Sequence, residues 1–371
     1  MNPVIRTETT VPIESATFSK SLGKVYESDD VLPDVAFQTP LDLDPFTMEE
    51  LIHVLKKMRN GKAADTSNIV IEMIKHAGDA FHSVLLGMFN QILLDGCVPA
   101  KWHITVFRMF PKSGNLNDVS NWRPIAILPI LYKCFGRLLY GRLLPILEAS
   151  QSNDQFGFRA NRRIEDVFGI IENIISKTNE WNLPFLMISL DLKKAFDRIE
   201  FGPLFAALRE QGVPDAYIQL LSILYQNQKG TVDGKMFFDI QRGVKQGDVL
   251  SAMLFNAGIE IVFRRWKARL CSEGFLLDVE AERLTNVRYA DDVLLFGKTE
   301  KEIQVMTEFL VEEFAKVGLE LNGSKSKILT NELLDYDFLD IAGDLVEIID
   351  DSKTHRYLGR FLSGNLDARV V

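Results

Sequence analysis

The sequence predicts a chain that mixes helices and strands, and it places acidic residues at the ends of its strands. A continuous apolar run over residues 185–190 is typical of a buried central strand, and it ends at Asp191. Short apolar runs on both sides of Asp291 and Asp292 predict a strand–turn–strand hairpin. Between these runs, apolar residues recur at helical spacing, which indicates amphipathic helices.

The composition is that of an ordinary globular chain. With 371 residues, 47% hydrophobic and 25% charged, it is long enough for two or three subdomains with a large core. No apolar run is long and charge-free enough to span a membrane, and the first ten residues lack the apolar core of a signal peptide. Three cysteines, odd in number and far apart, favour a reducing compartment. We therefore expect an intracellular chain, in the nucleus or cytoplasm, with no membrane or protein partner evident.

The net charge of −9 and the pI of about 5.3 make the chain acidic. This balance argues against a broad, nonspecific surface for nucleic acid. It is compatible with a polymerase, because acidic residues of a metal site add to the negative charge.

The N-terminal half predicts several elements in order. Residues 1–45 are acidic and lack periodicity, which predicts a poorly ordered lead-in. A capping box of Thr47 and Glu50 begins a helix that Gly61 ends. The elements expected next are a helical stretch at 69–94, strands at 102–110 and 125–130 around a turn at 111–114, a helix at 131–147, an aromatic loop at 154–159, and a helix at 165–179.

The C-terminal half continues this mixture. Helices are expected near 201–211 and 215–228, and residues 232–235 read as a hairpin turn. Asp248 precedes a long apolar helix that reaches about Leu270. A second capping box, Thr299 with Glu302, begins a helix that ends at Gly318, and short strands and turns follow.

Three carboxylates would lie at one edge of one sheet if the strands that carry them are neighbours. Asp191, Asp291 and Asp292 repel one another and resist burial, and a divalent cation would relieve that repulsion. Two Mg²⁺ ions about 3.5–4 Å apart activate a 3′-hydroxyl and stabilise a leaving pyrophosphate. A solvated turn is the alternative for an isolated Asp-Asp pair, and spacing alone does not decide between them.

Further motifs occur in a fixed order along residues 45–362. SLDLKKAFD (189–197), RGVKQGDVLS (242–251) and YADD (289–292) resemble motifs A, B and C of reverse transcriptases of non-long-terminal-repeat (LINE-like) retrotransposons. NGKA (60–63) resembles the family's amino-terminal extension motif, and NWRPI (121–125) and QFGFR (155–159) resemble fingers motifs. GLELN (318–322) with Lys325 resembles motif D, and YLG (357–359) resembles motif E.

This resemblance implies an α+β, right-hand polymerase fold with fingers and palm, the palm being an antiparallel sheet backed by helices. It implies a reverse transcriptase domain over 46–362, with fingers at about 46–180 and part of 212–250, palm at about 181–211 and 250–345, and a motif E hairpin at about 346–362. No thumb helices follow motif E, so the thumb is expected to be absent or truncated, with 363–371 as a truncated end.

The resemblance also implies residue roles. Asp191, Asp291 and Asp292 would be catalytic and would bind two Mg²⁺ ions, or Mn²⁺ as an alternative, with the Leu192 carbonyl as an extra metal ligand. Contacts to the incoming dNTP are implied for Lys112, Arg123, Leu192, Ala195, Phe196, Gln246, Gly247 and Lys325. Template–primer contacts are implied for Gly157, Arg159, Tyr289, Tyr357, Leu358 and Gly359.

Some of these positions have structural alternatives. Phe196 corresponds to the steric gate that rejects a ribose 2′-hydroxyl; the alternative is plain core packing, and one side chain can do both. Lys112 and Arg123 could be surface cations. The chain also departs from the family: ADTSN (64–68) replaces a Pro-Gly-Pro-Asp-Gly-like run, and Val249 and Ala252 replace common prolines of motif B.

The function implied is an RNA-dependent DNA polymerase that acts on an RNA template, a DNA primer and dNTPs. The alternative is a catalytically inactive, truncated or domesticated nucleic-acid-binding protein derived from a transposon. Phe196 argues against an RNA-dependent RNA polymerase, whose ribonucleotide site favours a small or polar residue.

Overall fold

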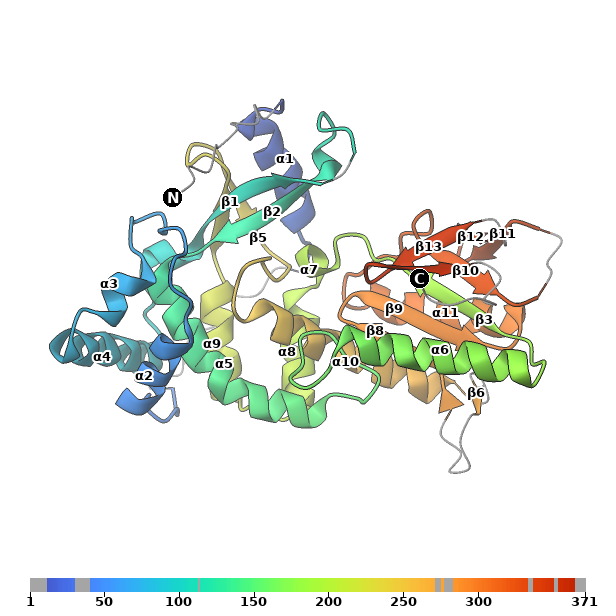
Figure 1. The fold of residues 1–371 in the computed structure, drawn as a ribbon. Coiled ribbons are helices and arrows are strands. Elements are labelled where there is room, and N and C mark those ends of the chain that lie inside the picture. The colour runs from blue at the N-terminus through green and yellow to red at the C-terminus, as the bar shows by residue number, and fades with distance from the viewer. Residues whose placement is uncertain are drawn as a thin grey trace, which may run out of the picture. The chain divides into compact units, whose positions relative to one another are not determined.

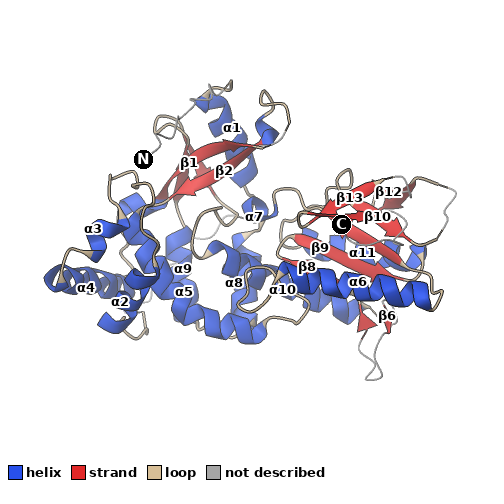
Figure 2. Cartoon of the chain, viewed as in Figure 1, coloured by secondary structure: helices blue, strands red, loops and turns tan. Residues whose placement is uncertain are grey.

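The computed structural model describes residues 12–30, 41–112, 114–270, 275–276, 283–332, 336–349 and 353–363 (Figure 1). The chain divides into two compact units, unit 1 of Met1–Gly141 with Pro214–Ser251, and unit 2 of Arg142–Val213 with Ala252–Val371. Both units contain helices and a sheet, as the sequence predicts (Figure 2). No helix within the described ranges is long and apolar enough to cross a membrane.

The sheet of unit 1 has the strand order β2-β1-β4-β5. β1 (Ile104–Pro111) pairs antiparallel with β2 (Trp122–Ile127) and parallel with β4 (Gln228–Thr231), which pairs antiparallel with β5 (Phe237–Ile240). The turn predicted at 232–235 is confirmed, since it joins β4 to β5. The helix predicted to reach residue 228 is too long, because α9 (Asp215–Tyr225) ends before β4 begins.

Helices α1 to α4 of unit 1 precede its first strand, β1. α2 (Met48–Lys57) begins at the predicted capping box, in which Thr47 and Glu50 bond to each other's backbone N–H groups. The prediction of a single helical stretch at 69–94 is wrong. This stretch is divided into α3 (Ile71–Lys75) and α4 (Asp79–Asp95), because Gly78 between them has a φ of 83°, which an α-helix does not allow. Two short 3₁₀ turns, η1 (Ala100–His103) and η2 (Val119–Asn121), flank β1.

The expectation of poor order across the N-terminal lead-in is wrong for α1 (Ser15–Tyr26). Its Phe18, Leu22 and Tyr26 recur every fourth residue, and all three are buried. The Tyr26 ring stacks on the ring of Phe107 in β1, with centroids 5.6 Å apart. This apolar stripe, hidden within an acidic and Pro-containing stretch, is the helical signal that the sequence analysis missed.

The sheet of unit 2 carries the acidic residues, and its strand order is β11-β12-β10-β3-β9-β8. β3 (Leu186–Leu190) is buried at every position and lies between β10 (Lys327–Thr330) and β9 (Asp292–Gly297), so the predicted central strand is confirmed. β9 pairs antiparallel with β8 (Asn286–Tyr289), which confirms the predicted hairpin. The remaining strands are β11 (Phe338–Ile341), β12 (Asp344–Ile348), the hairpin β13 (Thr354–Tyr357) and β14 (Arg360–Ser363), and the pair β6 (Phe275–Leu276) and β7 (Arg283–Leu284).

Helices cover this sheet. α6 (Ile164–Glu180) runs along the sheet in Figure 1, and its Phe168 and Ile171 share a buried core with Met187 of β3 and Phe296 of β9. α11 (Glu300–Ala315) contacts β3 and β9, and the Met306 carbonyl of α11 accepts a 2.8 Å hydrogen bond from the buried Trp266 side chain in α10. The remaining helices are α5 (Ile130–Ser150), α7 (Ala195–Arg198), α8 (Phe201–Glu210) and α10 (Ser251–Arg269). Residues 142–180, expected in the fingers, therefore pack with unit 2.

Candidate active site

The register of the unit 2 sheet brings Asp191 next to Asp292. β3 and β9 are antiparallel neighbours in which Leu190 pairs with Val293, so the next pair along this register is Asp191 with Asp292. Opposed residues of an antiparallel pair project from the same face of the sheet. The prediction that these strands are neighbours is therefore confirmed, and Asp191 and Asp292 lie at the same end of the strand pair, where the Asp191 charge raises the pKa of Asp292.

The turn between β8 and β9 has a constrained backbone. Tyr289 pairs with Asp292, which leaves Ala290 and Asp291 as a two-residue loop. Ala290 has a φ of 59° whereas Asp291 is not left-handed, the pattern of a type II′ turn, in which glycine is usual at the first position. An alanine in this conformation costs about 1 kcal/mol or more. Because Ala290 is also buried, contacts with its neighbours must stabilise this backbone conformation.

The charges of Asp191 and Asp291 act on Asp292. Desolvation, followed by the negative charges of Asp291 and Asp191, raises the pKa of Asp292 to about 7. Asp292 is exposed at the surface of the unit, beside these two negatively charged neighbours. A divalent cation would relieve this repulsion, and carboxylate oxygens are the ligands that Mg²⁺ prefers, so the donor set fits the metal. Among the described residues, no three His, Cys, Asp or Glu side chains already stand in the arrangement of a metal site.

The loop before β10 wraps around Asp191. Asn322 donates from its side-chain Nδ2 to the Asp191 carboxylate at 2.8 Å and from its backbone N–H to the Asp191 carbonyl at 2.8 Å. The Ser326 hydroxyl accepts the Asp191 N–H at 3.1 Å, and Leu192 forms an isolated antiparallel bridge with Leu321. Asn322 ends the stretch that resembles motif D, but that resemblance implies no role for it. The predicted Lys325 is exposed three residues further on.

Phe196 lies in an aromatic group just after Asp191. Its ring stacks on Phe255 of α10 with centroids 4.3 Å apart, and it makes an edge contact with Phe158 at 6.3 Å. Ala195 is buried beside it at the start of α7. The ring is held by packing, and its role as a steric gate stays a prediction, because one side chain can serve both purposes.

The motif E hairpin, β13–β14, lies against the start of β9. The buried Tyr357 donates its hydroxyl to the Asp292 carbonyl at 3.4 Å. Burial, followed by the charges of Asp292 and Asp291, raises the pKa of Tyr357 well above its usual value. Leu358 and Gly359 form the turn of this hairpin, and both have positive φ. Primer contacts for these three residues stay predictions.

The predicted template residues Gly157 and Arg159 have contacts of their own within unit 2. The Arg159 guanidinium is nearly buried and bonds to the Glu148 carboxylate at 2.8 Å and the Ser152 carbonyl at 2.7 Å. A Cβ on Gly157 would lie 2.5 Å from the Ala290 nitrogen, so only glycine allows this close approach. Their contact with a template stays a prediction.

Lys112 and Arg123 lie at the same end of the β1–β2 hairpin in unit 1. Arg123 pairs with Phe110 in the sheet register, and the Lys112 N–H donates to the Asn121 carbonyl at 2.7 Å. Both residues are exposed. This placement keeps two cations close together, as recognition of a polyphosphate requires.

The motif B loop lies alongside β2, which is an edge strand of the unit 1 sheet. The Gln246 carbonyl accepts the Ala126 N–H at 2.8 Å. Gly247 has a φ of 107°, and a Cβ there would lie 2.9 Å from the Ala126 carbonyl oxygen. The glycine is therefore required both by its backbone conformation and by this contact.

A buried polar cluster that sequence analysis missed supports this loop. Lys245 is fully buried and donates to the Gln228 side chain at 2.7 Å, and burial lowers its pKa to about 8. The Tyr132 hydroxyl donates to the Asp248 carboxylate at 2.7 Å, and the Ser251 hydroxyl donates to the Lys245 carbonyl. Only the place of Lys245 and Asp248 within motif B could have indicated this cluster from the sequence.

Comparison with known proteins assigns the chain to a family. Residues 110–361, more than half of the chain, match the reverse transcriptase (RNA-dependent DNA polymerase) family. The chain therefore belongs to the reverse transcriptase family, and its relatives are proteins of non-LTR retrotransposons.

Two relatives and one solved structure illustrate this similarity. Over 86% of its length the chain is 29% identical to a transposon TX1 uncharacterised 149 kDa protein of Xenopus laevis, and it covers 24% of that protein. Over 94% of its length it is 26% identical to the RNA-directed DNA polymerase from mobile element jockey of Drosophila funebris, covering 39%. The chain thus spans about a quarter to two fifths of these relatives. Its fold resembles apo telomerase from Candida tropicalis, truncated from its C-terminal domain, with a TM-score of 0.50 and 13% identity over 74% of this chain and 56% of that one.

Proposed function

We propose that this chain is the RNA-dependent DNA polymerase domain of a LINE-like retrotransposon, which adds dNTPs to a primer 3′-hydroxyl on an RNA template. The observation that carries the proposal is the β3–β9 register, which sets Asp191 beside Asp292 in a member of the reverse transcriptase family. The name of the jockey relative, an RNA-directed DNA polymerase, supports the same reaction.

The chain's own residues would prepare the site for metal. Asp191, Asp291 and Asp292 would hold two Mg²⁺ ions, or Mn²⁺, with the Leu192 carbonyl as a further ligand. When bound, these ions lower the pKa of the attacking hydroxyl and neutralise the leaving pyrophosphate. The Asn322 amide, bonded to one oxygen of Asp191, fixes the orientation of that carboxylate.

Other residues would hold the nucleotide. Lys112 and Arg123 are suited to pair with the triphosphate, because they are exposed cations at one end of a hairpin. Lys325 would lie near the leaving pyrophosphate. Phe196 and Ala195 would face the sugar, and Gln246 and Gly247 would line the base and ribose.

The remaining predicted residues would contact the template and primer. Gly157 and Arg159 belong to the segment beside the catalytic turn, and Tyr289 begins that turn. Tyr357, Leu358 and Gly359 would position the primer end from the motif E hairpin.

Incorporation of labelled dNTPs on a primed RNA tests the proposal. The wild-type chain should extend the primer only when Mg²⁺ is present, and Asp291→Asn should lose this activity. Asp340→Asn is a matched control, because Asp340 is an exposed carboxylate of the same unit whose bond to the Gly343 N–H the amide can keep. Equal extension by wild type and Asp291→Asn would overturn the assigned chemistry. Duplex binding without incorporation by the wild type would favour a non-catalytic binding protein.

A further inference from the structure

We propose that Gln155 is a positioning residue that holds the Tyr289–Asp292 turn in the conformation that the catalytic carboxylates need. The proposal rests on the proposed function for its catalytic consequence, but its structural part stands on contacts within unit 2. In the sequence, Gln155 is the first residue of QFGFR (155–159), and its place there gives no indication of a contact with the turn.

The Gln155 side chain bonds directly to the turn. It is fully buried, and its Oε1 accepts two backbone N–H groups at 3.2 Å, one from Gly157 and one from Ala290. Its Nε2 lies 3.4 Å from the Gly157 carbonyl. The Ala290 N–H belongs to the one residue of the turn with a left-handed backbone, so the amide acts at the point where the hairpin is most constrained.

The backbone around Gln155 covers the edge of the catalytic hairpin. β8 is the edge strand of the sheet, and Gln155 forms a parallel bridge with Arg288 on its open side. The Arg288 N–H donates to the Asp154 carbonyl at 2.8 Å, and the Phe156 N–H donates to the Arg288 carbonyl at 2.8 Å. An edge strand that would otherwise present unpaired N–H and C=O groups is therefore closed by this short segment.

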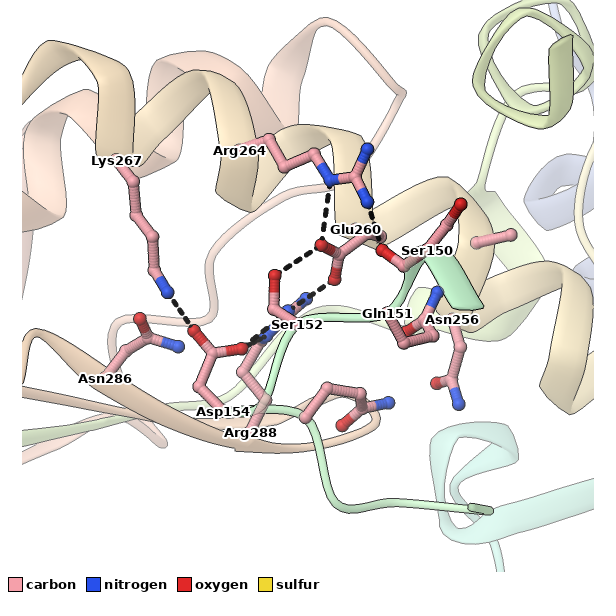
Figure 3. Close-up of polar contacts among 12 residues, drawn as sticks. Ser150, Gln151, Ser152, Asp154, Asn256, Glu260, Arg264, Lys267, Asn286 and Arg288 are labelled. Carbon is pink, nitrogen blue, oxygen red and sulfur yellow. Dashed lines mark hydrogen bonds and ion pairs between the residues drawn. The ribbon is translucent and has the colours of Figure 1, made fainter. Parts of the chain in front are cut away.

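Buried charges fix the same segment in place (Figure 3). The fully buried Arg288 side chain bonds to Asp154 at 2.8 Å and to the buried Glu260 of α10 at 2.7 Å. Lys267 also pairs with Asp154, and the Ser152 hydroxyl donates to Glu260. Burial alone would raise the pKa of Asp154, but the charges of Arg288 and Lys267 outweigh it.

Together these contacts connect α10, the segment at 152–157 and β8 into one support for the turn. The Asn256 side chain adds a further bond from α10, donating to the Gly157 carbonyl at 2.9 Å. Losing the Gln155 acceptor would leave the buried Ala290 N–H unsatisfied, and a buried unsatisfied donor is costly. The turn would then relax, and Asp291 and Asp292 would move away from Asp191 at the end of the β3–β9 pair.

Hydrogen–deuterium exchange, resolved to the Ala290 amide by fragmentation, tests this inference without any polymerase activity. We compare wild type, Gln155→Met, which keeps the bulk but removes the acceptor, and Gln211→Met. Gln211 is a matched control because it is buried in the same unit and its amide bonds to Ala207, Ala257 and Gln151 rather than to a residue of the 289–292 turn. Mn²⁺ titration of the free protein and steady-state kinetics on a primed RNA complete the comparison.

In the wild type, the Ala290 amide should exchange at least ~100-fold more slowly than an open amide. Gln155→Met should speed that exchange at least ~10-fold, weaken Mn²⁺ binding, and lower kcat by ~10-fold with little change in KM. Gln211→Met should leave all three unchanged even where it lowers Tm. A wild-type Ala290 amide that exchanges like an open one overturns the inference, whether or not Gln155→Met folds. Equal effects of the two variants on the turn overturn it as well. Polymerisation that fails in the wild type while Ala290 is protected counts against the proposed function alone.

Discussion

Replacing Glu260 by Met should destabilise unit 2 strongly, because it leaves the buried Arg288 with half of its charge partners. Both side chains are fully buried, and the Arg288 Nη2 lies 2.7 Å from the Glu260 carboxylate and 2.8 Å from Asp154. Taking one partner from a buried ion pair costs about 3–5 kcal/mol, since the remaining charge is neither hydrated nor paired. Because Asp154 still contacts Arg288, we expect about 3 kcal/mol, at the lower end of that range.

This loss is large enough to measure by heat or urea. For a unit of this size, 1 kcal/mol corresponds to about 2–4 °C in Tm, so Glu260→Met should unfold roughly 6–12 °C lower. Trp266 is buried in α10, the helix that carries Glu260, and its fluorescence reports on this unit. Glu312→Met is the control, because its pair with Arg269 is exposed and should contribute under about 1 kcal/mol.

A double-mutant cycle with Arg288→Met then isolates the pair. The double variant removes both charges and should be at least about 1 kcal/mol more stable than the sum of the two single losses predicts. A loss below about 1 kcal/mol for Glu260→Met, or strictly additive losses, would refute the reasoning that buried charges fix this segment.

Three further outcomes follow from the site. Phe196→Ala should increase ribonucleotide incorporation relative to dNTP by on the order of 10-fold, and an unchanged ratio in competition assays would count against the steric gate. Gly157→Ala places a methyl group 2.5 Å from a backbone nitrogen of the catalytic turn and should reduce both Tm and extension, whereas Gly169→Ala, with open space in α6, should not lower Tm. Burial, followed by the charge of a nearby lysine, lowers the pKa of His355 to about 4 from an ordinary 6.5, so unfolded chains bind more protons between these values. Stability should therefore fall as pH drops from about 6.5 towards 4, and Tm scans of His355→Gln should show a smaller fall.

Local patterns made much of the fold predictable from the sequence. The central strand β3, the β8–β9 hairpin, the Thr47–Glu50 capping box and the Thr299 N-cap of α11 are each encoded within a few neighbouring residues, by apolar runs or by cap side chains. The second capping box is only half formed, because the Glu302 carboxylate accepts the Lys298 N–H and not that of Thr299. α1 was missed because its apolar stripe lies in an acidic stretch, and the break at Gly78 was missed because apolar spacing continues across it.

The support of the site was not predictable in the same way. Gln155 meets Ala290, and Asn322 meets Asp191, across 135 and 131 positions of sequence. Such contacts depend on which strands become neighbours in the sheet, and the local periodicity of the sequence does not predict strand neighbours. The three aspartates could be predicted as catalytic because a family motif marks them. Gln155 and Asn322, which bond to their turn or to Asp191, carry no chemical signature of their own.

Single-turnover primer extension on an RNA template tests most directly whether Asp191, Asp291 and Asp292 form a metal-dependent polymerase site. The rate is measured for wild type, Asp191→Asn and Asp292→Asn at saturating Mg²⁺, with Asp340→Asn as the folded control. The account predicts template-dependent extension by wild type and the control, and a fall on the order of 10³-fold or more in both aspartate variants. Extension by either variant at the wild-type rate would contradict it.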